Sequence, residues 1–185
     1  MFRDGLAAIF TFGGVIAAGT FGFSMTEVII FAIVGNLVAA AGAVIGGRLD
    51  DKIGPKAVIL ISLVGLLIAG AGVFFSPAAS GFWVFGLILC LFVGPAQSAA
   101  RSYLSRLIPE GREGEMFGFF AMTGRAVSFL APALFSLSVA IAIPLVGSGQ
   151  AQRYGIIGIL IVLAVGLLLL LPIKTPQKIL KDHIS

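Results

Sequence analysis

The sequence predicts an all-α integral membrane protein with six transmembrane helices. Of its 185 residues, 59% are apolar and only 11% are charged, which is more hydrocarbon than a soluble domain of this size can bury. Apolar runs of about 20 residues, the length that crosses a bilayer as a helix, recur along the chain. These runs lack the period-two alternation of membrane barrel strands, so helices are the only spanning structure open to them.

Six apolar runs define the predicted helices in chain order. They cover residues 2–23, 27–47, 57–75, 82–104, 117–144 and 154–171. Together they predict one transmembrane domain over residues 1–172, followed by a basic tail over 173–185. A signal peptide is the disfavoured interpretation of the first run, because Asp4 lies at its start and no clean A-x-A cleavage site follows it.

Local signals mark where helices begin, bend and pack. Ser24 and Glu27 fit a capping box that opens the second helix; the alternative for Glu27 is an external gate or proton acceptor. Pro95 and Pro132 lie near the middle of the fourth and fifth helices, where proline permits a bend. The first three helices are rich in glycine, including a GxxxG motif over 42–46, and such faces predict close contacts between helices.

The basic residues indicate how the helices are oriented. Successive helix ends alternate between the two sides of the membrane. On one side, Arg153 is the only basic residue at the helix ends. At the helix ends on the other side lie Arg3, Arg48, Lys52, Lys56, Arg101, Arg106, Arg112, Lys174, Lys178 and Lys181. The positive-inside rule then places both termini and the loops after the second and fourth helices in the cytoplasm, for a multi-pass protein of the cell (inner) membrane. The positive charge is explained by orientation, so no nucleic-acid partner is predicted.

Residue types needed for catalysis are scarce. Cys90 is the single cysteine and lies in the apolar stretch LILCLF, where a small buried or lipid-facing side chain is the simplest interpretation. His183 is the single histidine and lies in the polar tail. Because no nucleophile–base pair or metal-ligand cluster is recognisable, we predict no enzyme, no cofactor and no metal site.

Four of the polar residues inside the predicted spans are candidates for a solute cavity. Asn36 is in the middle of the second helix, Gln97 and Arg101 share a face of the fourth, and Arg125 lies about two turns inside the fifth. A charge at membrane depth costs several kcal/mol, so it faces a wet cavity or a partner. The alternatives are a hydrogen bond between helices for Asn36, a tether for Gln97 and Arg101, and snorkelling for Arg125.

Asp4 completes this candidate cavity set. It is the only acid near the start of the first helix, and it pairs with Arg125 if the first and fifth helices adjoin. Rescue by exchanging the two charges tests that hypothesis.

The stretch GRLDDKIGPK, residues 47–56, resembles the cytoplasmic-loop signature of the major facilitator superfamily, G-x-x-x-D-[RK]-x-G-[RK]-[RK]. The matching positions are Gly47, Asp51, Lys52, Gly54 and Lys56, whereas Pro55 replaces a usual base. The resemblance implies a loop that latches one conformation, with Asp51 at a helix N-terminus, Gly47 allowing close approach and Gly54 making the turn. An ordinary charged loop explains the orientation but not the spacing.

Two longer stretches, FRDGLAAIFTFGGVIAAGTFG and GPAQSAARSYLSRLIPEGREGEMFGFFAMTGRAVSFLAP, resemble the second half of the vacuole-effluxer branch of that superfamily. Fungal members of the branch are linked to autophagy and amino-acid export. The resemblance implies half of a major-facilitator-type bundle, a 3+3 inverted repeat.

Such a half needs a second six-helix half, from a separate chain or a homodimer, to move a small polar solute, with amino acids as one class, by alternating access among membrane lipid. The alternative is a truncated or accessory membrane protein that packs against a partner without transporting.

Overall fold

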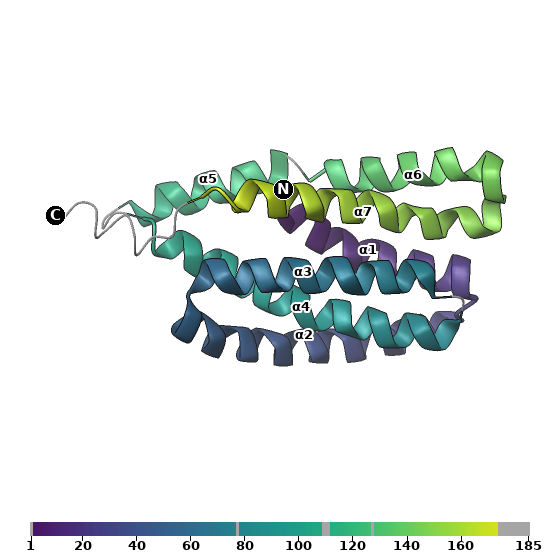
Figure 1. Cartoon of the computed structure of the whole chain (residues 1–185), viewed down its shortest axis with the longest axis horizontal. Helices are drawn as coiled ribbons and strands as arrows, with labels where there is room; N and C mark the ends of the chain where they lie inside the picture. Colours follow the sequence, from purple (N-terminus) through teal and green to yellow (C-terminus); the bar gives the residue numbers. More distant parts are fainter. Residues whose placement is uncertain (1, 77, 109–111, 127, 174–185) are drawn as a thin grey trace.

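The computed structural model describes residues 2–76, 78–108, 112–126 and 128–173, and within these ranges it contains seven helices and no strand. Figure 1 shows the helices running along the long axis of the molecule. In chain order they are α1 (Phe2–Phe21), α2 (Met25–Ile53), α3 (Pro55–Phe75), α4 (Ala79–Ser105), α5 (Glu113–Ala126), α6 (Leu130–Val146) and α7 (Ser148–Leu170). The all-α prediction is confirmed for the described residues. The predicted tail lies outside them except for Ile173.

Among the described residues, five helical stretches are long and apolar enough to cross a membrane, not six. They are α2, α3, α4, the stretch Gly114–Val146 that joins α5 and α6, and Gln150–Leu170 of α7. The first helix differs from the prediction because Gly22, at φ 70°, ends it before Phe23. Its apolar part, Gly5–Phe21, reaches about 25 Å at 1.5 Å per residue, which is short of a hydrocarbon core of ~30 Å.

The predicted helix over 117–144 is interrupted. α5 ends at Ala126 and α6 begins at Leu130, so that Pro132 falls in the first turn of α6. Proline has no amide hydrogen to donate and its ring clashes with the carbonyl four residues earlier, at Ser128. On the other side of the break, the Ser128 backbone amide and hydroxyl both donate to the carbonyl of Arg125, at 3.2 and 2.8 Å. The bend predicted at Pro132 is therefore a break between two helices.

The second helix begins as predicted. The Ser24 hydroxyl accepts a hydrogen bond from the Glu27 amide at 3.3 Å, and the Ser24 amide donates to the Glu27 carboxylate at 2.8 Å. This reciprocal arrangement is a capping box. The Glu27 carboxylate is thus engaged at the helix start, as the cap interpretation requires.

Glycine makes the main contact between α2 and α4. A Cβ atom added at Gly42 would lie 2.1 Å from the carbonyl oxygen of Leu91, and one added at Gly46 would lie 2.5 Å from Cβ of Pro95. Without hydrophobic burial as a driving force between helices in lipid, such close backbone approach is what holds them together. The GxxxG prediction is confirmed.

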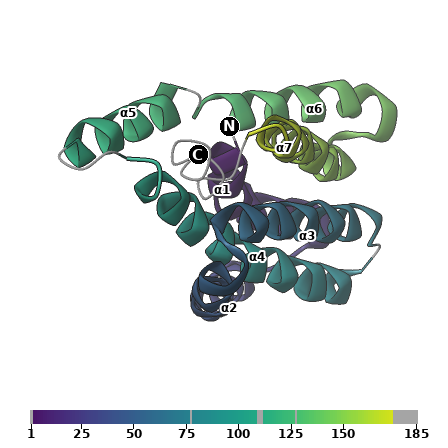
Figure 2. The ribbon, with the colours of Figure 1, turned by 60° about the vertical axis from the view of Figure 1, so that its left-hand side comes forward.

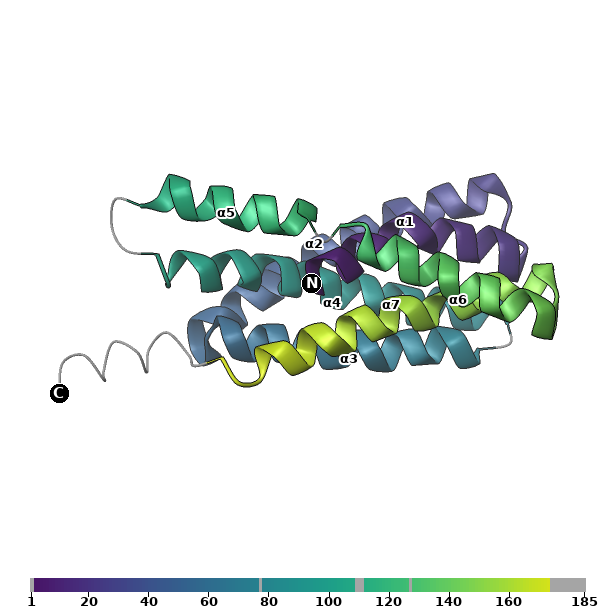
Figure 3. The same cartoon turned by 90° about the horizontal axis from the view of Figure 1, so that it is seen from above.

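Two sets of helices build the bundle. α4 packs against α2, α3 and α1, while α7 packs against α6, α1 and α3, and Figure 2 shows the two sets one above the other. The core between them includes the fully buried side chains of Leu63, Leu66 and Leu163. Viewed from above, α3 lies along one edge of the molecule and α5 along the other (Figure 3).

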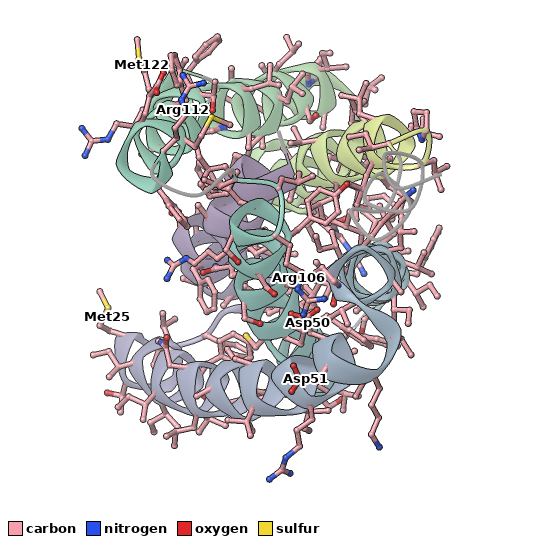
Figure 4. The ribbon with its side chains drawn as sticks, turned by 90° about the vertical axis from the view of Figure 1, so that its left-hand side faces the viewer. Met25, Asp50, Asp51, Arg106, Arg112 and Met122 are labelled. Carbon is pink, nitrogen blue, oxygen red and sulfur yellow. The ribbon has the colours of Figure 1, made fainter. Side chains whose placement is uncertain are left out.

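The view along the bundle shows which helices share a side. α5 and the start of α2, marked by Met25, lie at the left of Figure 4, α1 and α4 lie between them, and α3 and α7 lie at the right. α1, α4, α5 and the start of α2 therefore lie toward the side away from α3 and α7, whereas the end of α2, marked by Asp51, lies below α3.

Candidate functional site

An ion pair joins the ends of α2 and α4. Nη2 of Arg106, the residue that ends α4, lies 3.1 Å from Oδ1 of Asp50 in the last turn of α2 (Figure 4). The Asp50 side chain is 9% exposed and that of Arg106 is 35% exposed. Asp50 Oδ1 has no hydrogen-bond partner among the described residues, so the contact is electrostatic, between a buried carboxylate and a partly solvated guanidinium.

The local sequence explains why Asp50 is buried. Gly42, Gly46 and Asp50 are four residues apart, so they lie on the one face of α2 that packs against α4. The turn that follows is made by Gly54, whose φ of 84° suits glycine and whose amide donates to the Asp50 carbonyl at 2.9 Å. Pro55 then occupies the first position of α3, where its missing amide hydrogen costs nothing.

The predicted latch residues surround this ion pair but do not form it. Asp51 and Lys52 are exposed on the last turn of α2, and the Asp51 carboxylate forms no ion pair within the described ranges. A Cβ at Gly47 would meet no atom within 4 Å, whereas one at Gly46 would lie 2.5 Å from Cβ of Pro95; the role expected of Gly47 concerns a second half and stays a prediction. The structure thus holds Asp50, rather than Asp51, between helices, while the latch role of Asp51 concerns a second half and stays a prediction.

Lys56 connects the loop to the last helix. Its ammonium group donates to the carbonyl of Leu171 at 3.0 Å and to the carbonyl of Ile173. A cation at this position satisfies carbonyls that have no partner within the helix and complements the negative end of its dipole. The loop after α2 is therefore attached to α4 through Asp50 and to the end of α7 through Lys56.

The opposite end of the bundle carries a second polar contact. Arg153 of α7 donates to the carbonyl of Ser76 at the end of α3, and its guanidinium lies 5.8 Å from the ring centre of Phe21 and 5.9 Å from that of Phe74. These contacts tie α7 to α1 and α3. In the sequence analysis, Arg153 is the only basic residue assigned to this set of helix ends.

Four of the predicted cavity residues are exposed. Asn36 on α2 donates to the carbonyl of Ala32 in its own helix at 2.8 Å, and Gln97, Arg101 and Arg125 are exposed on α4 and α5. Hence the described residues offer no hydrogen bond between helices for Asn36. The side chain of Asp4, in the first turn of α1, lies outside the described part of the chain, so its predicted pairing with Arg125 stays a prediction.

These exposed polar residues come from α2, α4 and α5, and Thr11 of α1 and Thr123 of α5 are exposed with them. By contrast, residues 57–75 of α3 and 155–170 of α7 contain a single polar side chain, Ser62, which is 2% exposed. Along these apolar lengths, polar side chains are therefore scarce on α3 and α7 and more frequent on α1, α2, α4 and α5, while α6 also exposes Ser136.

Sequence reasoning missed Asp50 and gave Arg106 only a role in orientation. The signal was present in the spacing of Gly42, Gly46 and Asp50, which places a carboxylate on the glycine face of α2. The superfamily signature instead matches the next residue, Asp51.

Comparison with known families agrees with this architecture. Residues 1–181 match the family described as vacuole effluxer Atg22 like. The chain belongs to this family. The Atg22-like chain is also similar to an uncharacterized MFS-type transporter, YxiO of Bacillus subtilis (strain 168), with 26% identity over 154 residues, which is 83% of this chain and 35% of that protein.

A second relative is the D-xylose transporter of Levilactobacillus brevis, 29% identical over 103 residues, or 54% of this chain and 22% of that protein. The Atg22-like chain therefore spans only a minor part of the length of these relatives. No solved structure matches it. With its apolar helices and transporter relatives, the Atg22-like chain is a multi-pass membrane protein, and its relatives are named as transporters rather than enzymes.

Proposed function

We propose that this chain is a six-helix half of a secondary transporter that moves a small polar solute across the cell membrane. α5 and α6 together supply one span and the shorter α1 another, which completes six. The second half comes from a separate chain or a second copy, and the solute crosses between the halves by alternating access. Amino acids are one class of solute to test.

The observation that carries this proposal is the uneven distribution of polar side chains among the helices. Asn36, Gln97, Arg101 and Arg125 are exposed on α2, α4 and α5, whereas residues 57–75 of α3 and 155–170 of α7 expose no polar side chain. A polar side chain facing lipid is costly, so these helices meet water or a partner. A bundle surrounded by lipid on every side would have no reason to separate its helices in this way.

Two of these helices, α2 and α5, also expose large apolar residues that suit a partner half. Ile33 and Leu37 of α2 are 58% and 67% exposed, and Phe119 and Met122 of α5 are 57% and 70% exposed. With polar residues from α4 between them, α2 and α5 can pack against a second bundle while the polar centre stays open to water.

The loop after α2 supplies the conformational latch in this proposal. Asp50 and Arg106 hold α2 to α4, and Lys56 holds the loop to α7. Asp51 and Lys52, exposed beside the ion pair, are free to contact the second half in one conformation and leave it in the other. By the positive-inside rule, the basic residues of this loop support a cytoplasmic position for the loop and for both termini.

Reconstitution of the purified chain in liposomes tests the proposal. The oligomeric state is measured, and flux of a panel of amino acids and sugars is followed for the wild type and for Gln97→Ala, with Ile61→Ala, an exposed residue of α3, as the matched control. We expect flux from an assembly of two halves that Gln97→Ala alters and Ile61→Ala does not. A monomer without flux, also when co-expressed with any adjacently encoded half, contradicts transport.

A further inference from the structure

Pro95 deprives one backbone carbonyl of α4 of its usual donor. Proline has no amide hydrogen, so the carbonyl four residues earlier, at Leu91, loses its hydrogen bond within the helix. α4 nevertheless continues through Pro95, and Leu91 lies midway along its 27 residues. In the middle of a membrane span no water replaces the missing donor, so a neighbouring group has to satisfy this carbonyl.

Gly42 of α2 lies directly against the Leu91 carbonyl. A Cβ atom added at Gly42 would lie 2.1 Å from the Leu91 oxygen and 3.2 Å from Cδ of Pro95. Such a Cβ takes the place of one glycine hydrogen, so a Cα–H bond of Gly42 points toward the oxygen. Because a C–C bond is about 1.5 Å long, the Gly42 Cα lies within about 3.6 Å of the oxygen, in the range of a Cα–H···O contact.

The contacts around Pro95 also hold the two backbones together. A Cβ at Gly46, one turn further along α2, would lie 2.5 Å from Cβ and 2.8 Å from Cα of Pro95. In the opposite direction, a Cβ at Gly94 would lie 2.0 Å from the carbonyl oxygen of Ala39 on α2. Gly42, Gly46 and Pro95 are all buried. The proline is thus enclosed by the backbone of α2.

We propose that the Cα–H group of Gly42 serves as the donor that Pro95 cannot supply to Leu91, and that this contact locks α4 at its proline. Pro95 is then no hinge. Bending α4 at Pro95, or moving α2 away from it, would leave the Leu91 carbonyl unpaired in the membrane, where an unsatisfied carbonyl is costly. α2 and both halves of α4 therefore move as one rigid unit. The inference requires a membrane but does not depend on transport.

A distance measured along α4 tests whether the helix bends at Pro95. Val84 and Ser105, both exposed, lie on either side of Pro95 and about 30 Å apart along the helix. Spin labels are attached at Val84→Cys and Ser105→Cys in the full-length chain, in a Cys90→Ser background in lipid vesicles, and electron paramagnetic resonance gives the distribution of distances between them. We expect a narrow distribution in this parent chain, and the same distribution after Pro95→Ala, because the proline is already held.

Gly42→Leu should release the proline by pushing α2 away from the Leu91 carbonyl. We expect a broader distribution that extends to shorter distances, and a return to the narrow one when Pro95→Ala is added, because alanine restores the missing amide hydrogen. Ala41→Leu, at the exposed neighbouring position of α2, is the matched control and should leave the distribution narrow. Gly42→Ala, the milder variant, should broaden it less and replaces Gly42→Leu if that chain does not fold.

Three results would overturn the proposal. A broad distribution in the parent chain that Pro95→Ala narrows would show that α4 bends at Pro95 despite Gly42. Equal broadening by the Gly42 variants with and without Pro95→Ala would show that Gly42 acts through packing alone and not through the carbonyl. A distribution that no Gly42 variant changes would show that Gly42 does not hold the proline.

Discussion

Asp50 and Arg106 form an ion pair at 3.1 Å between the last turn of α2 and the end of α4, where the carboxylate is buried and the guanidinium is partly solvated. The pair lies beside a helix contact made by Gly42 and Gly46, in which backbones nearly touch. Motion that separates α2 from α4 must break both contacts together. The ends of these two helices therefore move as one body, and the exposed loop residues beside them move with it.

Replacing Asp50 by asparagine should destabilise the chain, because the Arg106 guanidinium would then face an uncharged amide in place of a carboxylate. Removing one partner of a fully buried pair costs about 3–5 kcal/mol; with Arg106 one-third exposed, we expect Asp50→Asn to cost about 1–3 kcal/mol. Because Cys90 is buried, a thiol-reactive dye labels it when the chain unfolds. The temperature at which this labelling begins measures the loss of stability.

The matched control is Asp51→Asn, which alters an exposed carboxylate and should change stability by less than about 0.5 kcal/mol. Equal effects of the two variants would contradict the assignment of Asp50. Exchange of the charges, Asp50→Arg with Arg106→Asp, should recover part of the lost stability.

Gly46 and Gly47 are adjacent but should respond in opposite ways to alanine. Gly46→Ala forces a methyl group to within 2.5 Å of Pro95, and such overpacking costs about 1–3 kcal/mol. Gly47→Ala meets open space and should gain up to about 1 kcal/mol in helix propensity. The same Cys90 labelling measures both variants, and a loss of stability at Gly47 equal to that at Gly46 would argue against the contact between α2 and α4.

Lys56 should protect the end of α7 from local opening. Lys56→Met removes the donor to the carbonyls of Leu171 and Ile173, each bond being worth about 0.5–1.5 kcal/mol. We expect amide hydrogen exchange in the last turn of α7 to become faster, with little change at its start. Lys52→Met, which removes an exposed ammonium group from the same loop, is the control and should leave that exchange unchanged.

Arg153 should be needed for stability, because its guanidinium joins α7 to Phe21 at the end of α1 and to Phe74 and Ser76 at the end of α3. Arg153→Met keeps the length of the side chain but removes the bond to Ser76 and both aromatic contacts, for an expected cost of about 1–3 kcal/mol. Arg48→Met, at an exposed position of α2, should be nearly neutral. A neutral result for Arg153→Met would mean that the aromatic contacts contribute nothing.

The sequence predicted much of this fold because bilayer length and composition act over whole helices. The capping box at Ser24 and Glu27 and the turn at Gly54 are confirmed because each depends on residues close in the chain. The GxxxG contact at Gly42 is confirmed because a glycine face on a membrane helix predicts close packing whichever helix supplies the partner. The end of α1 at Gly22 and the break before Pro132 were missed, since a run of apolar residues does not show where a hydrogen-bond ladder stops.

The site was less predictable. Whether Asp50 or Asp51 is buried depends on the register of α2 against α4, a tertiary property that a one-residue shift reverses. The attachment of Lys56 to α7 joins residues more than a hundred positions apart, and no local pattern signals it. The polar positions on α2, α4 and α5 could be predicted because a polar residue stands out in an apolar run. How the helices that carry them are arranged in the bundle could not be predicted, because it depends on helix packing.

The central claim is that α1, α2, α4 and α5 face water or a second half while α3 and α7 face lipid, and water accessibility tests it most directly. In a Cys90→Ser background, single cysteines replace Gln97 and Arg125 on one side, and the exposed Ile61 and Val165 of α3 and α7 on the other. Each chain is exposed in membrane vesicles to a charged, water-soluble thiol reagent. We predict rapid labelling at Gln97→Cys and Arg125→Cys and none at Ile61→Cys and Val165→Cys; equal labelling on both sides, or labelling of α3 and α7 alone, would contradict the account.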